Sequence, residues 1–130
     1  MNIVDSSCWL EYFSGSKIGD KVSGIIEDVD NLLVPAITLY EVFKKLLVEV
    51  DEDRALFAVA HMKQAKVIDL NSDLAIYAAQ TGKEYGLAMA DSLIYATSRK
   101  FKARLYTSDK HFKELELVTY FENRILKGSK

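Results

Sequence analysis

Short apolar segments alternate along the chain with longer segments in which apolar residues recur at helical spacing. The short segments predict buried strands, at residues 3–4, 32–35, 66–70, 104–107 and 117–120. The longer ones predict helices, at residues 8–13, 18–28, 38–50, 51–62, 72–84, 87–101 and 110–115. Strands and helices that alternate in this way favour an α/β fold, a three-layer sandwich with a five-stranded parallel sheet and helices on both faces.

Several local signals support these boundaries. Gly15 predicts a turn after the first helix, Asn71 or Ser72 a helix N-cap, and Gly86 a helix end. The second helix has Val22, Ile25, Ile26 and Val29 on one side, and the third has Tyr40, Phe43, Leu47 and Val50 as its expected apolar stripe. The run Asp51-Glu52-Asp53 complements the dipole of the helix that it begins.

Length and composition predict one soluble globular domain over residues 1–130, with a frayed end at about 125–130. No apolar run approaches the roughly 20 residues of a membrane span, and no signal peptide is recognisable. We therefore expect no contact with a membrane. The only cysteine, Cys8, excludes an internal disulfide and suits a reducing compartment, so we expect a cytoplasmic protein. A net charge of −2 means that binding to nucleic acid would need a local basic patch or bound cations.

Four acids stand at corresponding places in this pattern. Asp5 follows the first strand and Asp109 the fourth, while Glu41 and Asp91 lie at the beginnings of two helices. Because the carboxyl ends of parallel strands meet at one edge of a sheet, these carboxylates can converge on one crevice.

Each acid also has an ordinary structural interpretation. Aspartate is a favoured N-cap, and Thr38 with Glu41 matches a capping box. Glu41 also lies away from the apolar stripe of its helix. The number of acids argues for more than capping, since crowded carboxylates repel one another unless a cation is bound. Oxygen ligands of this kind suit Mg²⁺ or Mn²⁺, which can promote phosphodiester hydrolysis.

Four motifs in the same order resemble those of PIN-domain ribonucleases, specifically VapC-type toxins. They are Ile3-Val4-Asp5-Ser6-Ser7-Cys8-Trp9-Leu10, Thr38-Leu39-Tyr40-Glu41-Val42, Ala90-Asp91-Ser92-Leu93-Ile94-Tyr95-Ala96 and Leu105-Tyr106-Thr107-Ser108-Asp109-Lys110-His111-Phe112. The resemblance covers essentially the whole chain.

The resemblance implies an acidic pocket of Asp5, Glu41, Asp91 and Asp109 that holds Mg²⁺ (or Mn²⁺) and cuts single-stranded or loop RNA. Ser6 and Thr107 match hydroxyl positions that orient the acids or the attacking water. The resemblance also implies a homodimer and a small antitoxin protein as partner.

Other candidates have weaker support. His111 is close to Asp109, but a site of oxygen ligands does not need an imidazole, and we expect structural roles for His111 and His61. Trp9, Tyr12 and Phe13 form either a base-stacking platform or, the ordinary interpretation, a core or dimer surface. Possible RNA-backbone contacts, if they cluster around the groove, are Lys44, Lys45, Arg99, Lys100, Lys102 and Arg104.

Two alternatives differ in class. A PIN-like binding or scaffold module would keep these acids only as helix caps. A phosphoacceptor receiver domain would need adjacent acids after the first strand and a lysine after the fifth, but Ser6 and Tyr120-Phe121 stand there. The receiver domain is therefore excluded.

Overall fold

A computed structural model describes residues 1–122, so the end predicted to fray at 125–130 lies outside the described residues. The strands are β1 (Asn2–Val4), β2 (Leu32–Pro35), β3 (Lys66–Ile68), β4 (Arg104–Thr107) and β5 (Val118–Tyr120). The α-helices are α1 (Ser6–Ser14), α2 (Lys17–Glu27), α3 (Ala36–Glu49), α4 (Glu52–Met62), α5 (Ser72–Tyr85) and α6 (Met89–Phe101). Two 3₁₀ turns are η1 (Val29–Asn31) and η2 (Lys110–Phe112).

The five strands form one sheet in the order β3-β2-β1-β4-β5, and every neighbouring pair is parallel. The predicted sheet is therefore confirmed. The chain builds outward from β1 through β2 to β3 on one side and then places β4 on the other side of β1. This reversal makes a switch point between β1 and β4, where a crevice opens beyond the carboxyl ends of the strands. Asp5 and Asp109 follow these two strands.

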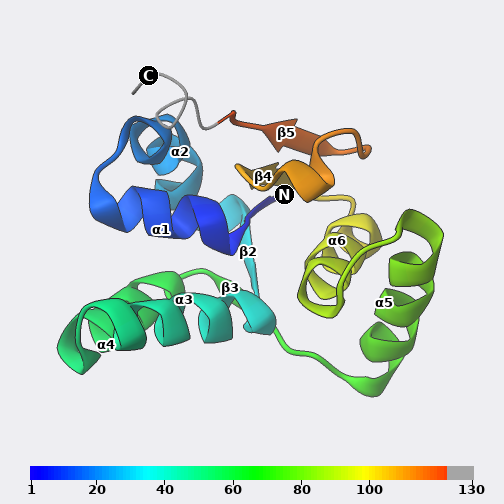
Figure 1. Cartoon of the computed structure of the whole chain (residues 1–130), viewed down its shortest axis with the longest axis horizontal. Helices are drawn as coiled ribbons and strands as arrows, with labels where there is room; N and C mark the ends of the chain where they lie inside the picture. Colours follow the sequence, from blue (N-terminus) through cyan, green and yellow to red (C-terminus); the bar gives the residue numbers. More distant parts are fainter. Residues whose placement is uncertain (123–130) are drawn as a thin grey trace.

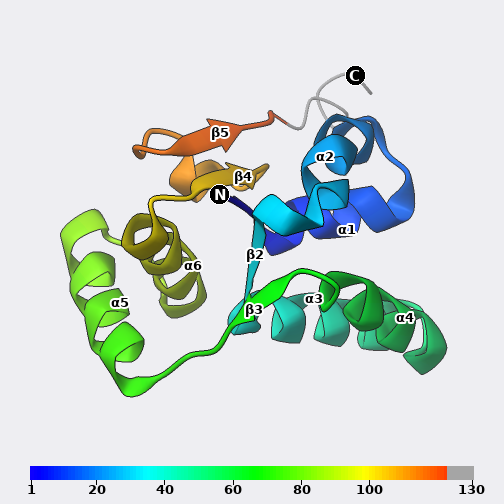
Figure 2. The ribbon, with the colours of Figure 1, turned by 180° about the vertical axis from the view of Figure 1, so that it is seen from behind.

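Helices cover both faces of the sheet, as Figures 1 and 2 show from opposite sides. Helices α1 to α4 pack on the face that carries Val4, Leu32 and Val34. Helices α5 and α6 pack on the other face, where Ile3 and Leu33 point. Adjacent residues of β1 and β2 thus bury their side chains in opposite layers, which is why Ile3, Val4 and all of β2 are apolar.

Helix ends follow the predicted signals at several places. Asn71 caps α5 by accepting a hydrogen bond from the Leu74 amide, 2.9 Å. Gly15 and Gly86 end α1 and α5 in the left-handed conformation, with φ of 74° and 68°. A side chain would be strained at either position.

The capping box predicted at Thr38 and Glu41 is wrong. Helix α3 begins at Ala36 with Pro35 as its N-cap, and the Thr38 hydroxyl donates to the Pro35 carbonyl, 2.7 Å. Proline fixes a φ suited to this entry and has no amide hydrogen of its own to satisfy. Glu41 therefore lies in the second turn, where it caps nothing.

The apolar stripe predicted for α3 is also wrong as a core face. Tyr40, Leu47 and Val50 are exposed, and the residues that α3 buries are Thr38 and Val42. Likewise Val29 does not extend the buried side of α2, because it lies in η1 and is 38% exposed. Within residues 1–122, no helix is long and apolar enough to cross a bilayer.

Candidate active site

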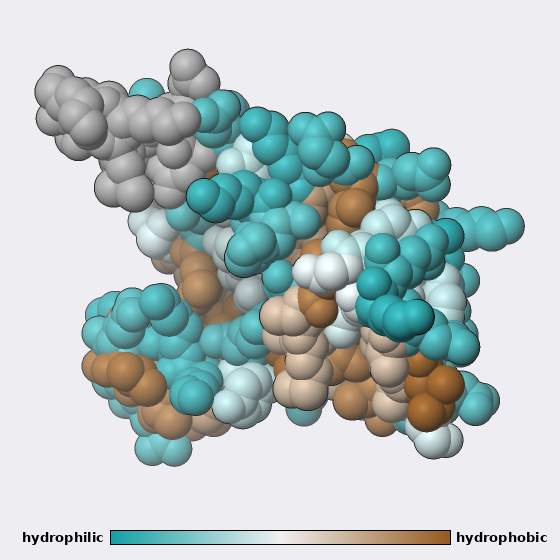
Figure 3. Space-filling view, turned by 45° about the vertical axis from the view of Figure 1, so that its right-hand side comes forward, coloured by the Kyte–Doolittle hydropathy of each residue, from teal (hydrophilic) through white to brown (hydrophobic). Residues whose placement is uncertain are grey.

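A pocket of about 580 Å³ opens at the carboxyl edge of the sheet, between α1, α3 and the beginning of α6. Its lining residues are Asp5, Ser6, Ser7, Leu10, Tyr40, Glu41, Lys44, Lys45, Val48, Glu49, Asp91 and Asp109. Figure 3 shows the surface hollowed where the block formed by α3 and α4, at lower left, faces the rest of the molecule. All four acids predicted from the sequence line this one pocket.

Asp5 is the most buried of these acids, with 3% of its surface exposed. Its Oδ1 accepts a hydrogen bond from the Ser6 amide, 2.8 Å, and so caps α1. Its Oδ2 accepts from the hydroxyls of Ser7, 3.0 Å, and Thr107, 2.8 Å. Asp5 therefore caps a helix and at the same time lines the pocket.

Thr107 and Ser7 join β1 to the loop after β4. The fully buried Thr107 hydroxyl donates to Asp5 and accepts from the Asp109 amide, 2.9 Å. The Ser7 hydroxyl donates to Asp5 and accepts from the Ser108 amide, 3.2 Å. Each hydroxyl uses both its donor and its acceptor capacity, so the two carboxylate-bearing segments are held in fixed register.

Glu41 reaches the same pocket from α3. Its Oε1 accepts a hydrogen bond from the Ser6 hydroxyl, 2.9 Å. Ser6, one of the two hydroxyl residues expected in the pocket, thus orients Glu41 through its hydroxyl and donates to Asp5 through its amide. Burial raises the pKa of Glu41, and the nearby carboxylates of Asp5, Asp91 and Asp109 raise it further, against the lowering effect of the Ser6 hydrogen bond.

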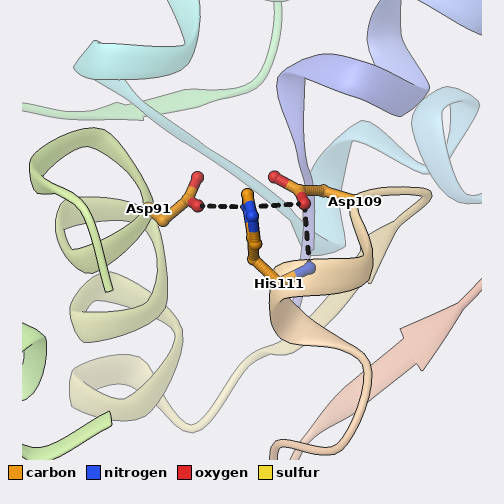
Figure 4. A group of neighbouring side chains, drawn as sticks. All are labelled: Asp91, Asp109 and His111. Atoms are coloured by element: carbon orange, nitrogen blue, oxygen red, sulfur yellow. Dashed lines mark hydrogen bonds and ion pairs between the residues drawn. The ribbon is translucent and has the colours of Figure 1, made fainter. Parts of the chain in front are cut away.

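Asp91 and Asp109 face each other across the imidazole of His111, as Figure 4 shows. Nδ1 of His111 is 3.0 Å from Oδ1 of Asp109 and 3.4 Å from Oδ2 of Asp91. Asp109 also caps η2 by accepting from the His111 amide, 2.9 Å. In the part of the chain that the structure describes, these three residues are the only metal-ligand-type cluster whose atoms lie within 4.8 Å of one another.

The pocket disfavours ionised carboxylates. The pKa of Asp91 is raised to about 6, first by burial and then by the charges of Asp109 and Asp5, although His111 lowers it. Burial also raises the pKa of Asp5, partly offset by its hydrogen bonds to Thr107, Ser7 and Ser6. Ionised acids crowded in this way cost folding free energy, which a bound cation would offset.

The donor set fits a hard divalent cation. Four carboxylates supply oxygen ligands, the kind that Mg²⁺ and Mn²⁺ prefer. Oδ2 of Asp5 accepts hydrogen bonds from the Ser7 and Thr107 hydroxyls, and Oδ1 accepts from the amide and the hydroxyl of Ser6, so the hydrogen bonds single out neither oxygen as the metal ligand. Asp91 and Asp109 are close enough together to share an ion, whereas Asp5 and Glu41 line the same pocket at longer range.

The basic candidates divide into two groups. Lys44 and Lys45 line the pocket, so they meet the clustering condition. Arg99 and Lys100 lie in the last turn of α6 and Arg104 begins β4, at the amino edge of the sheet and away from the acids. Arg99, Lys100, Lys102 and Arg104 therefore do not line this pocket, and their contact with RNA stays a prediction.

The aromatic residues of α1 pack with one another and with α4. Trp9 is 1% exposed, and it packs with Tyr12, Phe13 and His61 at ring-centroid distances of 5.8–6.3 Å. Trp9 is thus a core residue, while Tyr12 and Phe13 are half-buried and pack against the core, and His61 packs among these rings.

Two residues beside the acids were not assigned a role in the site from the sequence. One is Ser7, for which the signal in the sequence is an aspartate followed by two serines after a predicted strand. His111 was assigned a structural role, yet its ring lies between two carboxylates. The sequence shows that His111 is two residues from Asp109, but its contact with Asp91 depends on where η2 packs.

Together, the fold and this pocket define a three-layer α/β protein with an acidic site at the switch point of a parallel sheet. The sequence profile of the PIN domain matches residues 3–117. The chain therefore belongs to the PIN domain family. A search of curated protein sequences for relatives gives no match.

Solved structures confirm the fold. A chain of a toxin–antitoxin complex from Klebsiella pneumoniae superposes with a TM-score of 0.78 at 21% identity, over 95% of this chain and 100% of that one. VapBC2 from Rickettsia felis, bound to a promoter DNA fragment, gives 0.70 at 12% identity, over 93% and 98%. VapC20 of Mycobacterium tuberculosis, described as a toxin that cleaves the sarcin-ricin loop, gives 0.67 at 15% identity, over 99% and 95%.

Proposed function

We propose that this protein is a divalent-metal-dependent endoribonuclease that hydrolyses phosphodiester bonds in single-stranded or loop RNA. The observation that carries the proposal is the convergence of Asp5, Glu41, Asp91 and Asp109 on one pocket, with the pKa of Asp91 raised to about 6. Acids that served only as caps would not need to face one another. Glu41 caps nothing, which counts against the scaffold alternative.

The carboxylates that would hold Mg²⁺ or Mn²⁺ are those of Asp5, Glu41, Asp91 and Asp109. When bound, the ion supplies positive charge beside the scissile phosphate and makes a water molecule a better nucleophile. Thr107 and Ser7 fix the Asp5 carboxylate, and Ser6 fixes Glu41. These hydroxyls are positioning groups, because they reach the reaction only through the acids.

Lys44 and Lys45 extend the pocket along α3 with positive charge. In this proposal they neutralise phosphates of the bound RNA, which an acidic pocket alone would repel. A protein with a net charge of −2 needs such a local basic patch, or bound cations, to bind RNA.

The toxin role is part of the same proposal. The structures that superpose on this chain include toxin–antitoxin complexes, and one of them is described as cleaving an RNA loop. We infer that this protein is likewise the toxin of such a pair, that it acts in the cytoplasm, and that it forms a homodimer and is restrained by a small antitoxin protein.

The amide variants Asp5→Asn and Asp91→Asn test the activity. Each keeps the size of the side chain, and asparagine at position 5 keeps a capping group. Loss of groups that only support a metal ligand costs about 10–100-fold. Removing a ligand should therefore lower the kcat/KM for Mn²⁺-dependent cleavage of a single-stranded RNA by more than about 100-fold.

Asp51→Asn is the matched control. Asp51 caps α4 through the Arg54 amide, 2.7 Å, but it lies outside the pocket. This variant should cleave RNA like the parent. If Asp5→Asn and Asp91→Asn also cleave like the parent, the metal site is wrong; if the parent cleaves no RNA, the scaffold alternative is favoured.

A further inference from the structure

Tyr40 is an exposed aromatic residue in the wall of an otherwise polar pocket. It immediately precedes Glu41 in α3, and 59% of its surface is accessible. The structure leaves this ring uncovered although the aromatic residues of α1 are packed together nearby. An exposed tyrosine alone needs no explanation, but this one borders the proposed catalytic acids.

The pocket wall formed by α3 consists of two neighbouring strips at four-residue spacing. One is Glu41, Lys45 and Glu49, and the other is Tyr40, Lys44 and Val48. In the first strip, Lys45 and Glu49 form an ion pair at 2.7 Å. The second strip contains no acid, so it offers an apolar and positively charged path along the pocket.

Lys44 is the partner of the Tyr40 ring. Its Nζ lies 5.8 Å from the ring centroid, and among residues 1–122 the structure gives it no ion pair. A cation beside an aromatic face, left without a carboxylate partner, is available to a phosphate. The strip from Tyr40 to Val48 extends for about 12 Å of helix axis, which is room for more than one nucleotide.

We propose that Tyr40 is the stacking platform for one unpaired base of the RNA substrate, with Lys44 against the phosphate of the same strand. This inference rests on the proposed ribonuclease function and names the feature of the substrate that the site selects. A base in a duplex has both faces covered by its neighbours, whereas a base in a single strand or loop can leave the stack and lie on the ring. Tyr40 is therefore a specificity-determining residue for single-stranded RNA.

The test combines the variant Tyr40→Leu with substrates that lack one base. A single-stranded RNA that the parent cleaves in Mn²⁺ is prepared as a series with one abasic position each, and kcat/KM is measured for every protein–RNA pair. Stacking of one base is worth about 5- to 150-fold. Tyr40→Leu should therefore lower kcat/KM on the intact RNA about tenfold.

The two changes should be non-additive at one nucleotide. Removing the base that lies on Tyr40 should lower the kcat/KM of the parent about tenfold and that of Tyr40→Leu by less than about twofold. At every other abasic position, kcat/KM should fall by the same factor in the parent and in Tyr40→Leu. Tyr40→Phe keeps the ring and should restore the profile of the parent.

Phe57→Leu provides the matched control, because Phe57 is 67% exposed on α4 and does not line the acidic pocket. Its abasic profile should coincide with that of the parent. A second readout is the salt dependence, since Lys44→Met should reduce the slope of log(kcat/KM) against log[salt] by about one.

Additive losses for Tyr40→Leu at every nucleotide would overturn the inference while leaving the ribonuclease function intact. An unchanged kcat/KM for Tyr40→Leu would also overturn it and would assign the exposed ring to a protein contact. If the parent cleaves no RNA, the proposed function fails first and this inference fails with it.

Discussion

Two groups of acids in this molecule lie at or near helix beginnings, and they behave differently. Asp51, Glu52 and Asp53 at the start of α4 are all exposed, and Asp51 caps the helix. Asp5 and Asp91 begin α1 and α6 but turn toward each other, with Glu41 and Asp109, into one pocket. The α4 group is adjacent in sequence, whereas the pocket group is assembled from four separate segments.

The surroundings of an acid, more than its place on a helix, decide whether its ionised form lowers the stability of the fold. Solvent and the helix dipole stabilise the α4 acids. In the pocket, burial and mutual repulsion raise the pKa values of Asp5, Glu41 and Asp91. The α4 group therefore adds a little to stability, and the pocket group subtracts from it, a cost that the proposed cation would offset.

Removing a hydroxyl that supports the pocket should have the largest effect on stability. Thr107→Val keeps the shape of the side chain but deletes the hydrogen bond to Asp5 and the acceptor for the Asp109 amide. Hydrogen bonds to charged groups contribute about 1.5–3 kcal/mol. Urea unfolding should therefore show a loss of about 2–3 kcal/mol with an unchanged m value.

Thr81→Val is the control for this prediction. Thr81 is equally buried, but its hydroxyl donates only to the Tyr77 carbonyl, 2.9 Å, within the same helix. Its loss should cost about 1 kcal/mol or less. Thr107→Ser retains the hydroxyl and should recover most of the stability. Equal losses for Thr107→Val and Thr81→Val would mean that the pocket acids need no special support.

The sequence was sufficient to predict the fold and the convergence of the acids. Both follow from short-range patterns: apolar strands, helical spacing, and the rule that parallel strands end at one edge. Asp5 and Asp109 follow β1 and β4, which are direct neighbours in the sheet. Their proximity therefore depended on the strand order, which the structure shows and which local patterns in the sequence do not encode.

Packing between elements decided what could not be predicted. The spacing of Tyr40, Leu47 and Val50 is that of a core face, but α3 turns Thr38 and Val42 inward instead. A periodic pattern does not reveal which side of a helix a neighbour will cover. In the same way, the approach of His111 to Asp91 joins η2 to α6, and no local signal encodes that contact.

Metal binding should have the next largest effect on stability, and this effect should depend on the pocket acids and not on the α4 acids. At a Mn²⁺ concentration ten times the dissociation constant, a ligand that binds only the folded state stabilises it by about 1.4 kcal/mol. Thermal unfolding of the parent should therefore shift upward with MnCl₂, and the shift should disappear in Asp91→Asn. The readout needs no RNA, so it is independent of the substrate.

Asp53→Asn is the comparison variant, because Asp53 is an exposed acid in the first turn of α4. It should keep the full Mn²⁺ shift. A shift that survives in Asp91→Asn, or that is lost in Asp53→Asn, would place the ion among surface acids and contradict the pocket as the metal site.

The smallest expected effect is a dependence of stability on pH in the absence of metal. Because the pKa of Asp91 is raised from 3.8 to about 6 in the folded protein, the folded state binds a proton more tightly than the unfolded state does. The stabilisation that comes from protonation of Asp91 in the folded state is therefore fully present below about pH 4 and is lost as the pH rises through 6.

In EDTA, the melting temperature should fall by a few degrees as the pH rises from about 5 to 7.5. The slope should be smaller in Asp91→Asn and unchanged in Asp53→Asn. His111 lies against Asp91, so each protein is also compared in a His111→Gln background, which removes the contribution of their pairing. If Asp91→Asn retains the full slope in that background, the repulsion assigned to the pocket is absent, and the two groups of acids do not differ in electrostatic cost.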